Sequence, residues 1–362
     1  MPSRIASSPR WWILRTAALA DVTPARSRIY FRLEAGETTG WGHLARCAAL
    51  AAELQSRGWT CVAWTASDLD RMPPDFRAPF AETCAVEGEW TRHVPARAGD
   101  WVVVDCYGAS DADIAVVRHA VPAARVMVMD DEAARDLGAA HLVLNSRLGL
   151  ERSPYASATR VLLGEKFALL RTALRHPIAT PRAFDSELLP VLVMLGGSDP
   201  RGWTADVLHA LAEVDAAHVA PVVVHSRHGG NQEAIARARS RFPDGVWLER
   251  VDAATLAGWA GVCRYGVSAC GGAIYELALL GLPFAGLVVA ANQRALAVEV
   301  ERRWRLPMVD PSGAPGPALA EALRRLFREH PPAGTARRDP IGNVDGQGAA
   351  RVADAIESFD AG

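Results

Sequence analysis

The sequence alternates short apolar runs with helical stretches, and this alternation limits its fold more than any other feature. The run 101–104 has no polar face, as in a strand that helices cover on both sides. Alternation of this kind predicts a parallel, doubly wound sheet. In the first part of the chain the expected strands are 29–33, 60–64, 101–104, 126–129 and 141–144, with helices near 44–55 and 112–119.

The pattern begins again after an irregular stretch, 170–189, which contains Pro177 and Pro181 and which we interpret as a linker. The second set of expected strands is 190–195, 221–224, 246–248, 263–267 and 284–289, with helices near 203–212, 232–240, 254–259, 273–280, 294–304 and 318–327. A chain of 362 residues is long enough for two domains with separate cores. The sequence thus predicts an α/β protein of two doubly wound, Rossmann-like domains that face each other across a cleft.

The domain limits follow from the same pattern. The first domain is expected over 28–170 and the second over 190–330. The arginine-rich residues 1–27 are expected to be a disordered extension, and 331–362 a tail with a terminal helix.

The composition is not that of a nucleic-acid-binding or membrane protein. With 39 basic and 41 acidic residues the net charge is −2, and there is no basic stripe, so a small ligand is expected. No apolar run reaches the roughly 20 residues of a membrane-spanning helix, and the run 11–14 is cut off by Arg15, which argues against a secretory signal. The six cysteines form no C-x-x-C pair, as is typical of buried thiols in a reducing cytoplasm. We expect a cytoplasmic protein of undetermined oligomeric state.

A glycine-rich turn, residues 36–43, joins the first expected strand to the first helix and ends in His43. Glycines here allow backbone N–H groups to approach a phosphate or sugar, at the positive end of a helix dipole. Histidine is suited to proton transfer near neutral pH. The local sequence fits a tight turn with a helix-capping histidine equally well.

Polar residues follow the strands of the first domain at their carboxyl ends, where ligands bind to doubly wound sheets. Tyr107 is one of them, although an aromatic residue that packs on the sheet edge is the simpler interpretation of that side chain. The polar segments are 105–108, 130–132 and Asn145.

The second domain contains two further glycine turns between a strand and a helix. One is Gly196-Gly197-Ser198-Asp199, and the other lies between Ser268 and Glu276. Free N–H groups at a helix start can hold a diphosphate, and Glu276 is placed to accept hydrogen bonds from a ribose. A purely structural capping role for Glu276 stays open, as does an N-cap role for Asn292. His225 and His228 have no partners at metal-ligand spacing and are expected on a loop.

Taken together, these motifs resemble the UDP-sugar hydrolases of pseudaminic acid biosynthesis. Those enzymes have the GT-B fold, are related to the glycosyltransferase that makes lipid II, and look similar to spore-coat polysaccharide proteins. The resemblance runs in order from about residue 28 to 305. The matching positions are Arg32, Glu34, Gly40, Trp41, Gly42, His43, Arg46, Cys47, Asp105, Tyr107, Gly108, 130–132, Asn145, Gly164, Arg171, 196–199, 268–276, Asn292 and Gln293.

The resemblance implies a role for each motif. His43 would act on the hydrolytic water, while Tyr107 and Asn292 would line the sugar pocket. The reaction would break the glycosidic C–O bond of a UDP-linked diacetamido sugar with inversion, and neither a metal nor another cofactor is expected. The remaining expected substrate contacts are Arg32, Glu34, Gly40, Gly42, Arg46, Asp105 and Gln293, and the expected UDP contacts are Gly196, Gly197, Ser198, Ser268, Gly271, Gly272 and Glu276.

Two positions depart from the family pattern: Glu34 stands where the family usually has aspartate, and 269–272 replaces a serine-rich turn. Two other functions remain compatible with the sequence. A GT-B glycosyltransferase would use the same site with an acceptor hydroxyl in place of water. A nucleotide-sugar-binding protein would use it without catalysis.

Overall fold

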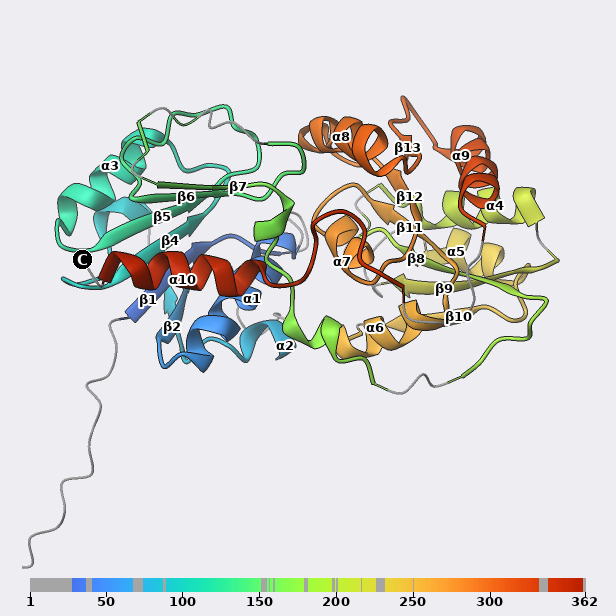
Figure 1. Ribbon diagram of the computed structural model, residues 1–362, viewed down its shortest axis with the longest axis horizontal. Helices are drawn as coiled ribbons and strands as arrows, with labels where there is room; N and C mark the ends of the chain where they lie inside the picture. The colour runs from blue at the N-terminus through green and yellow to red at the C-terminus, as the bar shows by residue number, and fades with distance from the viewer. Residues whose placement is uncertain are drawn as a thin grey trace, which may run out of the picture.

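The computed structural model describes residues 28–36, 41–67, 74–86, 89–150, 155, 157–158, 160–178, 182–196, 199, 201–215, 217–225, 232–249, 251–331 and 338–360. They form two α/β halves that lie side by side along the long axis of the molecule (Figure 1). Each half contains one parallel sheet. The expected extension 1–27, Gly40, Gly197, Ser198 and His228 lie outside the described residues.

The first sheet has seven strands in the order β3-β2-β1-β4-β5-β6-β7, and every pair is parallel. The strand order reverses between β1 and β4, and ligands bind to such sheets at the point of reversal. The strands are β1 (Arg28–Leu33), β2 (Thr60–Thr65), β3 (Glu82–Ala85), β4 (Trp101–Asp105), β5 (Arg125–Met129), β6 (Leu142–Asn145) and β7 (Arg160–Leu163).

Helices cover both faces of the first sheet, which explains why β4 is buried throughout. Helix α1 (Gly42–Ser56) packs on one face through Leu44, Leu50 and Leu54, and α3 (Asp111–Ala120) packs on the other. The short helix α2 (Pro74–Arg77) lies beside α1. Alternate residues of a strand point to opposite faces, so Asp105 shares the α1 face with Trp101 and Val103.

The second sheet has six strands in the order β10-β9-β8-β11-β12-β13, again all parallel, and it reverses between β8 and β11. Its strands are β8 (Leu189–Met194), β9 (Val219–His225), β10 (Val246–Glu249), β11 (Tyr265–Ala269), β12 (Phe284–Leu287) and β13 (Met308–Val309). Its helices are α4 (Thr204–Asp215), α5 (Gln232–Arg239), α6 (Ala253–Val262), α7 (Ala273–Leu279), α8 (Arg294–Trp304) and α9 (Gly316–Glu329).

The last helix, α10 (Gly348–Asp360), returns to the first half and lies alongside α1 (Figure 1). Its apolar side packs into the core under α1 through Val352 and Ile356. Arg57, at the end of α1, forms ion pairs with Asp354 and Glu357 of α10. The end of the chain therefore completes the core of the domain that begins it.

Each strand that the sequence predicted is present, within one or two residues at most ends. The strand predicted over 263–267 begins only at Tyr265, because Cys263 closes α6 with a hydrogen bond to the Trp259 carbonyl. The prediction that His225 lies on a loop is wrong, since this residue is the last of β9. The short strands β3, β7 and β13 were not predicted.

All six cysteines are free, and all but Cys84 are buried, which confirms the prediction of buried thiols for those five. Burial raises the pKa of Cys61 and that of Cys270 to about 12. In the part of the chain that the structure describes, no helix is both long and apolar enough to cross a bilayer.

Candidate active site

His43 lies at the first turn of α1, directly above the point where the first sheet reverses. Its Nδ1 is 2.7 Å from a carboxylate oxygen of Asp105, the last residue of β4. A carboxylate only accepts hydrogen bonds, so Nδ1 carries a proton, and in the neutral imidazole the lone pair is on Nε2. Nε2 bonds to none of the described residues, and the His43 side chain is 10% exposed.

Asp105 is fully buried and is held by three side chains of α1. Besides His43, these are Arg46, whose Nε is 2.8 Å from Oδ2, and Cys47, whose Sγ is 3.3 Å from the same oxygen. Residues three and four apart lie on one face of a helix, which is why this spacing converges on a single carboxylate. Burial by itself would raise the pKa of Asp105, but Arg46 and His43 hold the pKa well below its usual range. Asp105 is therefore an anion that orients His43.

Tyr107 and Asp131 extend this network toward the surface. Arg46 donates to Asp131 over 2.7 Å, and the Tyr107 hydroxyl donates to the other oxygen of Asp131 over 3.1 Å. The Tyr107 ring stands edge-on to His43 with centroids 4.6 Å apart, and Tyr107 is 54% exposed. Asp131 was not predicted as a site residue, although its place after β5 in a polar segment was a usable signal.

Asn292 joins the two halves at this point. It lies in a short 3₁₀ turn, 291–293, after β12, and its Nδ2 donates to the Tyr107 hydroxyl over 3.0 Å. The carboxyl ends of both sheets therefore meet at Tyr107. The neighbouring Gln293 turns inward, where its Oε1 accepts from the Val289 N–H over 2.9 Å.

Three of the predicted glycines border open space. A Cβ atom placed on Gly42, Gly196 or Gly272 would meet nothing within 4 Å, and Gly196 has a φ of +88°, which favours glycine. Gly271 is closer packed, with the Gln293 amide nitrogen 3.4 Å from the position of such a Cβ.

Glu276 and Arg171 form a second link between the halves. Arg171, in the connecting segment, donates to Glu276 Oε1 over 3.0 Å and to Asp75 of α2 over 3.4 Å. Glu276 Oε2 has no partner among the described residues and remains an available acceptor. Arg171 belongs to the motifs quoted above, but its partners could not be read from sequence.

Several predicted residues do not present their side chains to the surface. Ser268 is fully buried, and its hydroxyl donates to the Ala269 carbonyl. Arg32 is 4% exposed and donates to the Leu33 carbonyl and to Glu34. Asn145 bonds the buried Tyr155 inside the first domain.

Solved structures with 12–13% sequence identity match almost the whole chain. The S. aureus MnaA–UDP structure is 12% identical with a TM-score of 0.59, and the match covers 92% of this chain and 96% of that one. A UDP-N-acetylglucosamine 2-epimerase has the same identity and TM-score, with 93% and 96% covered. Acinetobacter baumannii MurG is 13% identical with a TM-score of 0.58, over 91% of this chain and 99% of that one. The chain has the GT-B fold.

The predicted GT-B fold class is thus confirmed. In this GT-B protein the two reversal points, β1/β4 and β8/β11, carry His43 on one side and Gly196 and Gly271 on the other. No protein-family model matches the sequence, and no curated protein matches it either.

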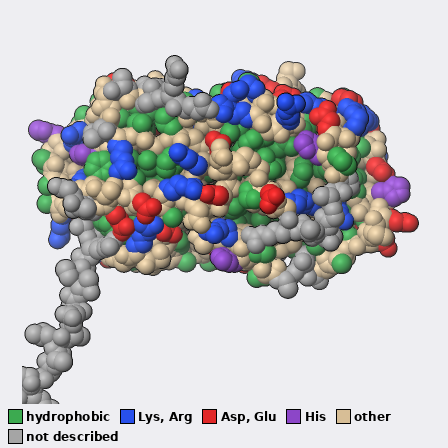
Figure 2. All heavy atoms as spheres, viewed as in Figure 1, with side chains coloured by type: hydrophobic (Ala, Val, Ile, Leu, Met, Phe, Trp, Pro, Cys, Tyr) green, Lys and Arg blue, Asp and Glu red, His purple; other side chains and the backbone are tan. Residues whose placement is uncertain are grey.

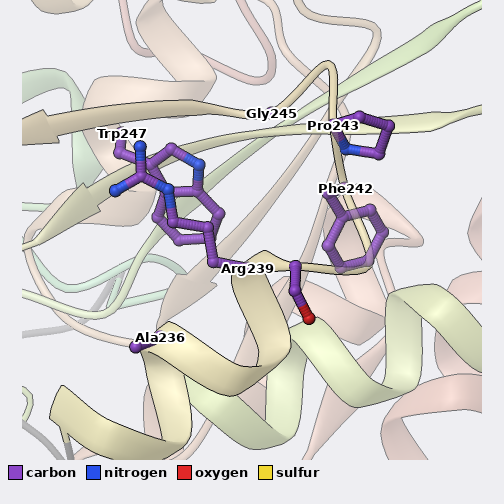
Figure 3. Close-up of a pocket in the computed structure, with 7 residues that line it drawn as sticks. Ala236, Arg239, Phe242, Pro243, Gly245 and Trp247 are labelled. Carbon is purple, nitrogen blue, oxygen red and sulfur yellow. The ribbon is translucent and has the colours of Figure 1, made fainter.

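Two cavities in the described part of this GT-B protein lie away from His43. One, of about 380 Å³, lies between α5 and β10 at the edge of the second sheet, where Arg239 stacks on Trp247 with 5.1 Å to the ring centroid (Figure 3). The other, of about 180 Å³, is lined in part by Trp64 and Trp90 on the sheet face opposite α1. On the face shown in Figure 2, basic and acidic side chains are interspersed, without a large patch of either sign.

Proposed function

We propose that this chain hydrolyses a UDP-sugar, releasing UDP and the free sugar. The observation that carries the proposal is His43, which a buried carboxylate holds through Nδ1 beside Tyr107 and Asn292, while Nε2 bonds to none of the described residues. Proteins of the same fold include an S. aureus structure that contains UDP and a UDP-N-acetylglucosamine 2-epimerase, which supports a UDP-sugar as ligand.

The chemistry needs a base and a site for the leaving group. His43 Nε2 accepts a proton from water as the water oxygen bonds to the anomeric carbon, and the C–O bond to UDP breaks with its electron pair leaving on UDP. The ionised Asp105 stabilises the imidazolium that forms and passes no proton itself. Attack on the face opposite UDP inverts the anomeric carbon.

In this proposal the domain over 28–170 supplies the sugar and water side, and the domain over 190–330 supplies the UDP side. Tyr107 and Asn292 offer a hydroxyl and an amide to sugar substituents at the boundary. The resemblance described above supports a 2,4-diacetamido-2,4,6-trideoxy hexose, whose acetamido groups pair well with such donors and acceptors.

The open glycines Gly196 and Gly272 leave room for a diphosphate at the second sheet. Glu276, one of whose carboxylate oxygens bonds to none of the described residues, is the acceptor that we assign to the ribose hydroxyls. Arg171 fixes the other oxygen and thereby orients the group.

Replacing Glu276 with alanine is expected to weaken UDP binding about tenfold or more, because two charge-assisted hydrogen bonds are lost. Isothermal titration calorimetry measures this. Asp75→Ala, which removes the other partner of Arg171, is the matched control and is expected to retain the affinity. Unaltered UDP affinity in Glu276→Ala would refute the ribose role.

The function itself is tested by incubating the purified chain with a panel of UDP-sugars without an acceptor. Hydrolysis predicts equal amounts of UDP and free sugar, with the inverted anomer seen first by proton NMR. UDP release only after an acceptor alcohol is added would replace hydrolysis by transfer. Tight UDP-sugar binding without turnover in either case would leave a binding protein.

A further inference from the structure

Arg201 stands at the carboxyl end of the second sheet, in the segment that leads from β8 to α4. Its Nε donates to the Val289 carbonyl over 3.1 Å, just beyond the end of β12. Its guanidinium also lies over the Trp203 ring, 5.6 Å from the centroid. These two contacts fix the guanidinium at the edge of the sheet where the glycine turns lie.

The charge of Arg201 is unpaired in the part of the chain that the structure describes. Among the described residues no carboxylate pairs with it, and its Nη groups donate to none of them. Arg294, at the same edge, is different, because its Nε pairs with Asp310 at 2.7 Å. Arg171 is also paired, because it forms an ion pair with Glu276. An unpaired, positioned guanidinium is well suited to binding an anion in two-point fashion.

The start of α4 is capped by a carboxylate of the protein itself. Asp199 is 9% exposed and accepts from the N–H groups of Trp203 and Thr204 and from the Thr204 hydroxyl. Asp199 adopts a φ of +38°, a left-handed conformation that is uncommon outside glycine but enriched in aspartate. An anion of the protein therefore already lies at the helix start that the sequence suggested for a phosphate at Gly196.

Arg201 follows the turn at Gly196 in the chain and is connected to the turn at Gly271 by a series of contacts. Val289 accepts from Arg201 through its carbonyl and donates to Gln293 through its N–H. Gln293 in turn lies against Gly271, next to the open space at Gly272. A diphosphate held between Gly196 and Gly272 would consequently lie at the edge that carries the unpaired guanidinium.

We propose that Arg201 is the cation that binds the diphosphate of the substrate and stabilises it as it leaves. This inference rests on the proposed function for the identity of the ligand. The bridging oxygen gains negative charge as the C–O bond breaks, so the interaction strengthens in the transition state and Arg201 contributes to kcat as well as to binding.

The test compares Arg201→Gln, Arg201→Lys and the matched control Arg294→Gln. Arg201→Gln is expected to weaken UDP binding about 10- to 100-fold, by loss of charged hydrogen bonds, and to leave the affinity for uridine unchanged. Arg201→Lys restores part of the loss, and Arg294→Gln binds UDP as the parent does. Calorimetry with UDP, uridine competition and the rate of UDP release give the readouts.

Equal UDP affinity in Arg201→Gln would overturn the assignment, as would equal losses for UDP and uridine. Arg147, whose guanidinium contacts only the carbonyls of Asp131 and Glu132 among the described residues, is the other cation to compare. A selective loss in Arg147→Gln alone would move the role to the first domain. If the parent chain binds UDP through Arg201 but hydrolyses no UDP-sugar, hydrolysis fails while the diphosphate site stands.

Discussion

Replacing His43 with asparagine lowers kcat for UDP release by roughly 10²–10⁴-fold, the usual contribution of a general base. The asparagine amide can still donate to Asp105, but it places no basic nitrogen at the position of Nε2. Substrate binding is expected to change little, because the loss falls on the proton-transfer step. Steady-state kinetics with separate kcat and KM values measure the effect.

The control for this prediction is His119→Asn, at an exposed position near the end of α3. It should retain the parent rate. Circular dichroism and thermal unfolding establish that His43→Asn is folded. A folded His43→Asn variant with the parent rate would remove His43 from the mechanism.

Asp105→Asn is expected to lower kcat by about 10³–10⁴-fold, as loss of the orienting carboxylate does in other histidine-dependent enzymes. Asparagine can donate to Nδ1, which favours the tautomer with the proton on Nε2 and removes the base. The same change leaves Arg46 with only Asp131 as an acidic partner. Breaking a buried ion pair costs about 3–5 kcal/mol of unfolding free energy, and the remaining Asp131 contact favours the lower end.

A second buried aspartate, at the opposite end of β4 from Asp105, provides the matched control. Asp100, directly before β4, accepts from the N–H groups of Arg28 and Arg97 and is 6% exposed. Asp100→Asn should lower stability without the loss of turnover. If both variants lost activity to the same degree, Asp105 would have no special role beyond stability.

The lowered pKa of Asp105 also predicts a pH dependence of stability. A carboxylate whose folded pKa is depressed stabilises the folded state above its unfolded pKa of about 4, and this contribution declines progressively as the pH falls from that value toward the folded pKa. The difference in unfolding free energy between the parent and Asp105→Asn should therefore shrink between pH 7 and pH 3. Urea unfolding at a series of pH values measures it, and a constant difference would contradict the assignment.

Much of the architecture could be predicted because each strand carries its own signal. The run 101–104 is apolar on both faces, and the structure places it in the centre of a covered sheet. Helix α8 was predicted with the bounds that it has, since its apolar spacing matches one helical face. Short edge strands such as β3 and β13 were missed, because pairing with a neighbour, and not their own composition, makes them strands.

The candidate site could likewise be predicted only in part. His43, Asp105, Tyr107 and Asn292 could each be named from motifs at strand ends, and the structure brings these four together. The partner of each charged side chain could not be predicted. Asp199 caps α4, while Arg201 has no carboxylate partner among the described residues, and both facts depend on distances between loops.

By itself, the sequence determined the two doubly wound sheets and the identity of the residues at their carboxyl ends, because periodicity and glycine turns are local properties of the chain. Tertiary structure decided which of those residues bind partners within the described protein and which remain available to a ligand. Hydrogen bonds such as Arg46 to Asp105 join residues 59 apart in sequence, and Asn292 reaches Tyr107 over a separation of 185. Their geometry is set by how the sheets and helices pack, and this packing cannot be predicted from a local sequence pattern.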